Sequence, residues 1–274
     1  MTDVSAELRI AVAAFAARHR VLVAVDFDGT LAPFVVDPMK AKALPGGLEA
    51  LRAAASLGGV TAAVVSGRDL ATLSALTGIS PRDGITLIGS HGAQTRHSAQ
   101  TSDKPARDTI SPDDAISLDV AATARLAALH DELQAIGFRY PAVRLEYKPS
   151  AVVLHTRGVE PSVAAAATKE AHDVGGRHAG VHVLLGKDIV ELTVFEADKG
   201  TALVDLARRS SSEATLYLGD DVTDERAFAA LDPSSGDLTI KVGDGETVAA
   251  QRVSGPEAVV ELLKVFVDNR RLAG

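Results

Sequence analysis

The sequence predicts an α/β protein in which a parallel-sheet domain carries a smaller, inserted domain. Apolar runs rich in Val and Ile, such as residues 21–27 and 60–65, alternate with Ala-rich stretches of helical character. Unbroken apolar strands of this kind are typical of a parallel sheet that helices cover on both faces. In the middle of the chain the order changes to helix-strand-strand, repeated twice, which predicts an antiparallel sheet with helices on one face.

The parallel domain is expected to form from two separate stretches of chain. The first stretch predicts helices over residues 7–20, 47–56 and from 69 onward, and strands over 21–27, 60–65 and 85–88. The second predicts helices over 200–209 and 256–269, and strands over 215–218 and 238–242. We therefore expect a Rossmann-like parallel-sheet core over residues 1–106 and 195–274.

The inserted part begins after a polar segment. Residues 95–117 are rich in Ser, Asp, Thr and Pro and are expected to form a linker or exposed loop. Beyond them the pattern predicts helices over 118–136 and 161–174 and strands over 143–147, 152–156, 181–185 and 189–194. Residues 107–194 are thus expected to be a second α/β domain with an antiparallel sheet.

The composition restricts the partners and the location of the protein. A net charge of -8 argues against general nucleic-acid binding, so an anionic substrate would need a local positive site. No apolar run approaches the roughly 20 residues that span a membrane, and basic residues interrupt segment 7–20, unlike a signal peptide. Cysteine is absent, which excludes disulfides and fits a reducing compartment. We expect a cytoplasmic monomer with no nucleic-acid or membrane partner.

Polar or acidic turns follow three strands of the predicted parallel sheet, at residues 26–30, 66–68 and 219–221. Ligands of open α/β sheets bind at the carboxyl ends of the strands. This rule collects Asp26, Asp28, Ser66, Asp220 and Asp224 in one crevice. A single such aspartate is usually a helix cap or turn former, but a group of carboxylates in one place repels itself. A dication such as Mg²⁺, which prefers oxygen ligands, would remove that cost.

The spacing of Asp26 and Asp28 suggests paired roles. In an extended segment, residues two apart face the same side, so one carboxylate could attack phosphorus while the other transfers a proton. Lys199 begins a predicted helix, where a cation opposes the helix dipole unless an anion binds there. Ser66 precedes another helix whose free N–H groups favour anions. Taken alone, Lys199 could equally be an exposed lysine and Ser66 a plain helix cap.

Together these residues resemble the four motifs of the haloacid dehalogenase superfamily. The motifs are Asp26-Phe27-Asp28-Gly29-Thr30-Leu31, Ser66, Lys199 and Gly219-Asp220-Asp221-x-x-Asp224. The resemblance implies that Asp26 is the nucleophile, Asp28 the general acid and base, and that Ser66 and Lys199 hold the phosphate. It implies Mg²⁺ as cofactor, held by Asp26, the backbone of Asp28, Asp220 and Asp224. The insertion looks like the larger α/β cap of that superfamily, which selects the substrate.

Charged residues of the inserted domain could line a ligand pocket or a solvated sheet face. Glu146 and Lys148 alternate on one predicted strand and therefore face the same side, while Lys187 and Glu191 lie on or beside the last strand. Acidic and basic side chains in one cleft suit a ligand with many hydroxyl groups. From the spacing alone, ordinary ion pairs on a solvated face are the more common arrangement.

The inserted domain is similar to the cap of trehalose-6-phosphate phosphatases. The similarity rests on Glu146-x-Lys148-Pro149-Ser150, His155-x-Arg157, and Gly186-Lys187 with Glu191. It implies that Glu146, Lys148 and Glu191 bind sugar hydroxyls. Further implied substrate contacts are Arg68, His91, Arg157 and Lys187. One position departs from the pattern, because Thr156 follows His155 where the family usually has an aromatic residue.

We therefore expect an enzyme that hydrolyses trehalose 6-phosphate to trehalose and phosphate, acting as a stand-alone phosphatase. The alternative is a phosphatase of another sugar phosphate (sucrose-, mannosyl- or hexose-phosphate) with the same core and cap. A phosphomutase, a phospho-accepting signalling switch and a catalytically silent sensor are further readings. Asp28 argues against the switch, because a second acid/base speeds the loss of the phosphoryl group.

Overall fold

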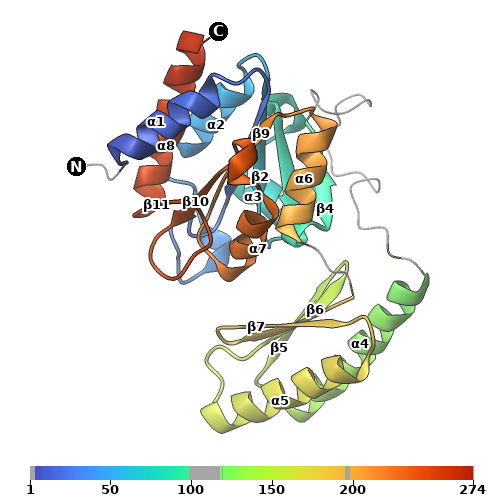
Figure 1. Cartoon of the computed structure of the whole chain (residues 1–274). Coiled ribbons are helices and arrows are strands. Elements are labelled where there is room, and N and C mark those ends of the chain that lie inside the picture. Colours follow the sequence, from blue (N-terminus) through green and yellow to red (C-terminus); the bar gives the residue numbers. More distant parts are fainter. Residues whose placement is uncertain (1–3, 99–117, 119, 195–197, 274) are drawn as a thin grey trace. The chain divides into compact units, whose positions relative to one another are not determined.

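The computed structural model describes residues 4–98, 118, 120–194 and 198–273 of the 274-residue chain. The chain divides into two compact units (Figure 1). The first combines Met1–Asp114 with Ala197–Gly274, and the second is Ala115–Glu196. The domain boundaries expected at 106/107 and 194/195 fall on or beside residues outside the described ranges, so those limits stay a prediction.

The first unit is built on a seven-stranded sheet with the order β11-β10-β9-β1-β2-β3-β4. Neighbouring strands are parallel except β3 and β4, which are antiparallel. The strands are β1 (Val21–Asp26), β2 (Val60–Val65), β3 (Ile85–Gly89), β4 (Gln94–Arg96), β9 (Ala214–Gly219), β10 (Leu238–Val242) and β11 (Gln251–Val253). Since β1 pairs with both β2 and β9, the turns that follow these three strands leave the sheet side by side.

Helices cover both faces of this sheet (Figure 1). They are α1 (Ala6–Ala16), α2 (Gly47–Ala55), α3 (Leu70–Thr77), α6 (Lys199–Arg209), α7 (Val222–Ala230) and α8 (Pro256–Ala273). Val21, Val23 and Val25 of β1 join a core with α1, α2, α3 and α8, whereas Leu22 and Ala24 face α6 and α7. This alternation is the period-two pattern of a strand that is buried on both sides.

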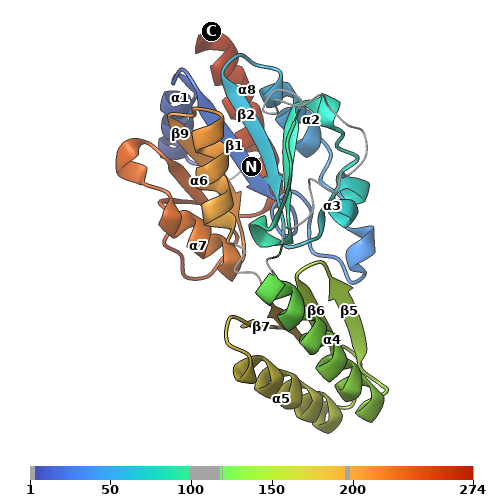
Figure 2. The ribbon, with the colours of Figure 1, turned by 90° about the vertical axis from the view of Figure 1, so that its right-hand side faces the viewer.

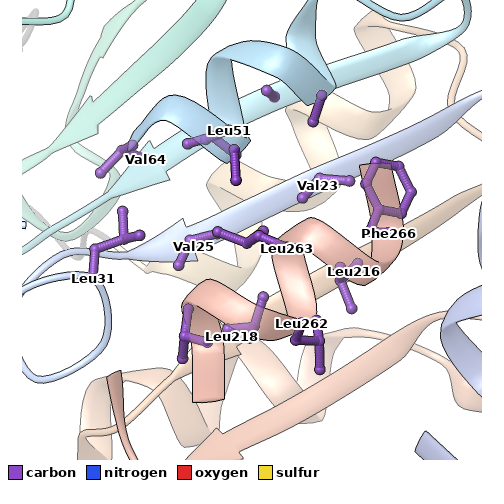
Figure 3. Close-up of a cluster of buried hydrophobic side chains, with 14 of the residues drawn as sticks. Val23, Val25, Leu31, Leu51, Val64, Leu216, Leu218, Leu262, Leu263 and Phe266 are labelled. Carbon is purple, nitrogen blue, oxygen red and sulfur yellow. The ribbon is translucent and has the colours of Figure 1, made fainter. Parts of the chain in front are cut away.

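The larger core lies between the sheet and α8 (Figure 3). Leu263 and Phe266 of α8 gather there with Val23 and Leu216 of the central strands, and none of these side chains is exposed. At about 25 cal/mol per Å² of apolar surface, this contact is a main source of stability for the first unit. It holds the central strands, and with them the site at their carboxyl ends, in a fixed register.

The second unit is a four-stranded antiparallel sheet with the order β5-β6-β8-β7 and two helices (Figure 2). The elements are α4 (Val120–Arg139), β5 (Arg144–Lys148), β6 (Ala151–His155), α5 (Pro161–Arg177), β7 (His182–Gly186) and β8 (Ile189–Thr193). Val152 and Leu192 of the sheet pack on Leu133 of α4 and Ala171 of α5. Both helices therefore cover one face, and the expected α/β fold with an antiparallel insertion is confirmed.

The structure corrects the expected linker. Thr95 and Arg96 form the end of β4, which pairs with β3 at the edge of the sheet. Arg96 is buried, and its guanidinium donates to Ser74 Oγ (2.9 Å) and to the Ile79 carbonyl. The polar composition concealed this strand, because here the polar side chains are hydrogen-bonded and not solvated. The rest of the expected linker, residues 99–117, lies outside the described residues.

Helix α7 and strand β11 were not expected from the sequence. Asp221 is the N-cap of α7 and Asp224 completes a capping box, so polar residues that read as a turn start the helix. Among the described residues, no helix combines the length and the apolar character that a membrane crossing needs.

Candidate active site

Asp26, Lys199 and Asp224 form the centre of the candidate site. Asp26 is the last residue of β1, Lys199 is the first residue of α6, and Asp224 lies in the first turn of α7. The ammonium Nζ of Lys199 donates to Asp26 Oδ1 and to Asp224 Oδ1, both at 2.7 Å. All three residues are buried, so the fold holds one cation between two carboxylates in a place that water hardly reaches.

Asp224 accepts hydrogen bonds at both of its carboxylate oxygens. Besides the bond from Lys199, Oδ1 accepts the hydroxyl of Tyr217 at 2.6 Å. Oδ2 accepts the backbone N–H groups of Asp220 (2.9 Å) and Asp221 (3.0 Å). Four donors therefore contact this one carboxylate. Asp224 thereby fixes both Lys199 and the turn that presents Asp220.

The electrostatics of the site differ from one carboxyl group to the next. Burial raises the pKa of Asp26 well above its usual value; Lys199 opposes this rise, while Asp224 and Asp220 add to it. Burial and the neighbouring Asp224 also raise the pKa of Asp220, to about 6. Burial acts to raise the pKa of Asp224 too, but the Lys199 charge and the hydrogen bonds lower it overall. Burial works against the charge of Lys199, yet Asp26 and Asp224 raise its pKa, so it stays protonated.

The donor set suits a hard divalent cation. Asp26, Asp220 and Asp224 each offer one carboxylate oxygen, and these oxygens lie within 4.8 Å of one another. When all three are ionised, the single charge of Lys199 does not balance them, and the repulsion between the carboxylates adds to burial in raising the pKa values of Asp26 and Asp220. A dication with a preference for oxygen ligands would balance them. The side chain of Asp28 is not part of this group.

Asp28 lies in the turn after β1, and its carboxylate is held by Arg68. The strand ends at Asp26, so the expectation that Asp26 and Asp28 share one extended segment is wrong. Arg68 Nε and Nη2 donate to the two oxygens of Asp28, both at 2.6 Å, a bidentate pair that fixes the carboxylate. The guanidinium also lies 5.9 Å from the ring centre of Phe27. Arg68 therefore bonds a carboxylate of the site, in addition to any contact with a substrate.

Ser66 and His91 belong to two loops that bind each other. Ser66 follows β2, and its hydroxyl accepts the N–H of Arg68 at 3.1 Å. The backbone N–H of His91 donates to the carbonyl of Ser66 at 3.0 Å. The His91 ring lies against Gly67, where an added Cβ would be 2.4 Å from the imidazole Cε1. Both residues thus lie at the carboxyl edge of the sheet, and their roles toward a phosphate or a sugar stay a prediction.

Two buried polar residues of this region escaped the sequence reasoning. Tyr217 lies in β9, with its hydroxyl on Asp224. Lys241 lies in β10, paired in register with Gly219, and its ammonium donates to the carbonyl of Asp220 and lies 3.9 Å from Glu225. A tyrosine and a lysine inside largely apolar strands were the available signal, because such residues are seldom buried without a partner.

The second unit brings three of its predicted residues together. Glu146 and Lys148 of β5 and Glu191 of β8 share the sheet face opposite α4 and α5, since all three alternate with the residues that pack on the helices. Lys148 Nζ donates to Glu191 Oε2 at 2.8 Å. His155 Nε2 lies 2.8 Å from Glu146 Oε2. His155 was part of the quoted sequence pattern but was not predicted as a site residue. The face therefore carries a row of paired charged and polar side chains.

Arg157 and Lys187 lie beyond the end of this row. Lys187 is an exposed residue of the turn between β7 and β8. Arg157 follows β6 with its side chain 63% exposed, and its Nε lies 3.9 Å from a carboxylate oxygen of Asp188 in the same turn. The structure thus places these two residues at one end of the sheet and not on its charged face.

A buried aspartate at the end of the central strand, bridged by a lysine to an acidic turn, is the arrangement that the resemblance to haloacid dehalogenase phosphatases implied. Residues 24–257 match the trehalose-phosphatase family, so the chain belongs to that family. The sequence-based predictions of family, fold class and enzyme class are confirmed.

Relatives and solved structures agree with this assignment. The chain is 35% identical to the trehalose-phosphate phosphatase of Mycolicibacterium paratuberculosis over 98% of its own length and 67% of that protein. It is 32% identical to that of Mycobacterium tuberculosis over 86% of its length and 58% of that protein. The C-terminal domain of the Candida albicans trehalose-6-phosphate phosphatase (22% identity, TM-score 0.74) covers 98% of both chains. The Aspergillus fumigatus enzyme (24%, TM-score 0.68) covers 95% of this chain and 97% of its own. The two structures support the fold.

Proposed function

We propose that this protein hydrolyses trehalose 6-phosphate to trehalose and phosphate through an aspartyl-phosphate on Asp26. The observation that carries the proposal is the buried contact of Lys199 with both Asp26 and Asp224, at the carboxyl end of the central strand. It supplies a carboxylate nucleophile and a fixed positive charge in one place. Membership of the trehalose-phosphatase family supports the substrate.

In the first step, a carboxylate oxygen of Asp26 attacks phosphorus and the bond from phosphorus to the sugar oxygen breaks. Protonated Asp28 gives its proton to that oxygen, and trehalose leaves. In the second step, a water molecule attacks the phosphorus of the aspartyl-phosphate and passes a proton to Asp28. Asp26 is regenerated and phosphate leaves. Acid–base assistance of this kind contributes about 10²–10⁴-fold, and a covalent intermediate divides one difficult step into two.

Lys199 and Ser66 are proposed to hold the phosphoryl oxygens. Two of the three ammonium protons of Lys199 are donated to Asp26 and Asp224, and we assign the third to the phosphoryl group. The position of Lys199 at the first turn of α6 supports this, because the free N–H groups there also favour an anion. The hydroxyl of Ser66 would supply a further donor.

Magnesium is the proposed cofactor. The side chains of Asp26, Asp220 and Asp224 with the backbone carbonyl of Asp28 would hold it, which extends the carboxylate group found in the structure. When bound, Mg²⁺ would neutralise charge on the phosphoryl oxygens and on the nucleophile. Asp26 would then remain ionised in spite of its burial.

Residues of the second unit are proposed to select the sugar. The charged face with Glu146, Lys148 and Glu191 supports this, because paired carboxylates and an ammonium can exchange their mutual bonds for bonds to sugar hydroxyls. Arg68, His91, Arg157 and Lys187 are proposed as additional contacts. The second unit would be the specificity cap, and the first the catalytic core.

We also propose a cytoplasmic monomer. The absence of cysteine fits a reducing compartment, and the net charge of -8 opposes binding to nucleic acid. Size-exclusion chromatography with light scattering would measure the mass in solution, and a dimer mass would overturn the monomer.

Phosphate release from a panel of sugar phosphates tests the proposed function. The panel contains trehalose 6-phosphate, sucrose 6-phosphate, glucose 6-phosphate and mannose 6-phosphate, each assayed with Mg²⁺ and with a chelator. We expect a strong, metal-dependent preference for trehalose 6-phosphate. Metal-dependent release from a different sugar would keep the mechanism and overturn the substrate. No release from any of them would overturn the proposed hydrolysis.

A further inference from the structure

The strand that precedes the acidic turn carries a buried tyrosine whose hydroxyl points at the site. Tyr217 in β9 is fully buried, and its ring packs against Phe228 of α7 with the ring centres 5.7 Å apart. The rest of the surrounding cluster is aliphatic and includes Leu203 and Leu206 of α6. Phenylalanine would fill this space equally well without the cost of burying a hydroxyl group.

The hydroxyl of Tyr217 donates a short hydrogen bond of 2.6 Å to Asp224 Oδ1. The same oxygen accepts the ammonium of Lys199 at 2.7 Å. Two donors therefore fix the direction of this oxygen, and Lys199 in turn reaches Asp26 at 2.7 Å. The contacts form one continuous chain from the core of the first unit to the proposed nucleophile.

The spacing of Tyr217 and Gly219 makes this contact possible. Residues two apart on a strand face the same side, so Gly219 lies on the same face as Tyr217. A Cβ at Gly219 would lie 2.3 Å from the carboxyl carbon of Asp224, so only glycine leaves room for that carboxylate. Asp224 thus occupies the space above Gly219, within reach of the tyrosine hydroxyl.

We propose that Tyr217 is a positioning residue of the phosphoryl-transfer site. Its hydroxyl holds Asp224, and Asp224 in turn fixes Lys199 against Asp26. The inference rests on the proposed function. Tyr217 does not touch the reacting atoms. Without the tyrosine hydroxyl, Asp224 keeps the backbone bonds at Oδ2, but Oδ1 is held by Lys199 alone, so the position of Lys199 is less definite. Mutation of a residue that only orients a functional side chain typically lowers activity by on the order of 10–100-fold.

The variant Tyr217→Phe tests this inference, with Tyr140→Phe as its matched control. Tyr140 donates its hydroxyl to Glu170 at 2.8 Å in the second unit, so both variants remove a tyrosine hydroxyl from a carboxylate. The rates are measured on trehalose 6-phosphate and on p-nitrophenyl phosphate with saturating Mg²⁺, well below the Tm of each protein. They are normalised to the folded fraction.

We expect Tyr217→Phe to lower kcat by roughly 10–100-fold, by the same factor on both substrates, with KM and Tm close to the wild-type values. Tyr140→Phe should match the wild type. An unchanged kcat, a change confined to KM, or a loss that disappears on normalisation would overturn the inference. A failure of the proposed function is distinct, because it shows in the wild-type protein, which would then not hydrolyse trehalose 6-phosphate.

Discussion

Lys199 is buried, and burying an unpaired ammonium group would cost a large desolvation free energy. It is 3% exposed, and two carboxylate oxygens at 2.7 Å compensate for its lost hydration. Burial and the neighbouring carboxylates Asp224 and Asp221 raise the pKa of the third carboxylate, Asp220, to about 6, although Lys199 and Lys241 oppose the rise. The site is therefore electrostatically incomplete, and a dication together with a phosphate ester would complete it.

A mutation of Arg68 can distinguish the positioning of Asp28 from the binding of substrate. Its guanidinium holds both oxygens of Asp28, so Arg68→Ala should leave the general acid poorly placed and lower kcat by on the order of 10–100-fold. The KM for trehalose 6-phosphate should rise as well, because Arg68 is also proposed to contact the substrate. Steady-state kinetics check this, with Arg9→Ala as a control that removes an arginine from a surface ion pair with Glu261. A higher KM with an unchanged kcat would show instead that Arg68 mainly binds substrate.

Residue types and their positions at strand ends were sufficient to predict Asp26, Asp220 and Asp224 as neighbours. Lys199 joined them in the prediction only through the resemblance to the family. The sequence did not predict that Arg68 bonds Asp28, because that contact joins two loops that are 40 positions apart. Tyr217 and Lys241 were missed for the same reason. Their partners are set by strand order and register, for example by the pairing of Lys241 with Gly219, and a sequence pattern does not contain this information.

The turn after β1 leaves no room for a larger residue at Gly29. Its φ of +81° lies in the left-handed region, and a Cβ would come within 2.1 Å of a carboxylate oxygen of Asp220. Gly29→Ala should displace that carboxylate and lower kcat by on the order of 10²-fold. Gly78→Ala is the matched control, because Gly78 also has a positive φ (+61°) but nothing within 4 Å of the added Cβ. It should cost roughly 1 kcal/mol of stability and leave kcat unchanged. Equal activity losses in both variants would contradict the steric explanation.

Asp83 predicts a pH dependence of stability. Its carboxylate accepts the N–H of Ser80 at 2.7 Å and Arg52 Nε at 3.0 Å, at the 3-10 turn Pro81–Asp83 before β3. Burial acts to raise the pKa of Asp83, but these hydrogen bonds and the charge of Arg52 lower it overall. A carboxyl group whose pKa is lower in the folded state stabilises the protein above its unfolded-state pKa, and this contribution disappears as the pH falls through the folded-state value.

Asp83→Asn should therefore reduce the free energy of unfolding by about 1 kcal/mol near neutral pH. The difference from the wild type should shrink as the pH falls below about 4. Urea unfolding at several pH values measures it. A difference that stays constant from pH 7 to pH 3 would mean that the charge of Asp83 contributes nothing.

Strongly apolar elements were predictable, and polar or edge elements were not. The bounds expected for β2 and β10 agree with the structure, because β2 is a nearly continuous apolar run and β10 has apolar residues at alternate positions. Strand β4 was taken for part of a linker, since its Gln94-Thr95-Arg96 sequence gains its hydrogen bonds only from the neighbouring β3. Helix α7 was missed because acidic residues surround its start, with Asp221 as its N-cap and Asp224 and Glu225 in its first turn.

At the scale of the whole molecule, the proposed function divides two tasks between two units. The first unit holds the carboxylates and Lys199, and the second carries the charged face proposed to bind sugar. Mutations in the first unit should then affect the hydrolysis of every phosphate ester. Mutations on the charged face of the second unit should affect only sugar substrates.

Glu146→Ala tests that separation. The loss of a charged acceptor for a sugar hydroxyl should lower kcat/KM for trehalose 6-phosphate by roughly 10- to 100-fold. Hydrolysis of p-nitrophenyl phosphate, which has no sugar, should be little affected. Glu170→Ala is the control, because Glu170 bonds Tyr140 and Arg139 on the helical side of the same unit. Equal losses on both substrates would mean that Glu146 is not a sugar contact.

The most direct test of the central claim is to trap the phosphoryl group on Asp26. Asp28→Asn should slow hydrolysis of the aspartyl-phosphate more than its formation from p-nitrophenyl phosphate, whose leaving group needs no proton. Acid quenching of a single turnover, followed by peptide mass spectrometry, should show phosphate on the peptide that contains Asp26. It should show none when Asp26→Asn is added. Turnover without a phosphorylated Asp26 peptide, or phosphate on a different residue, would contradict the covalent mechanism.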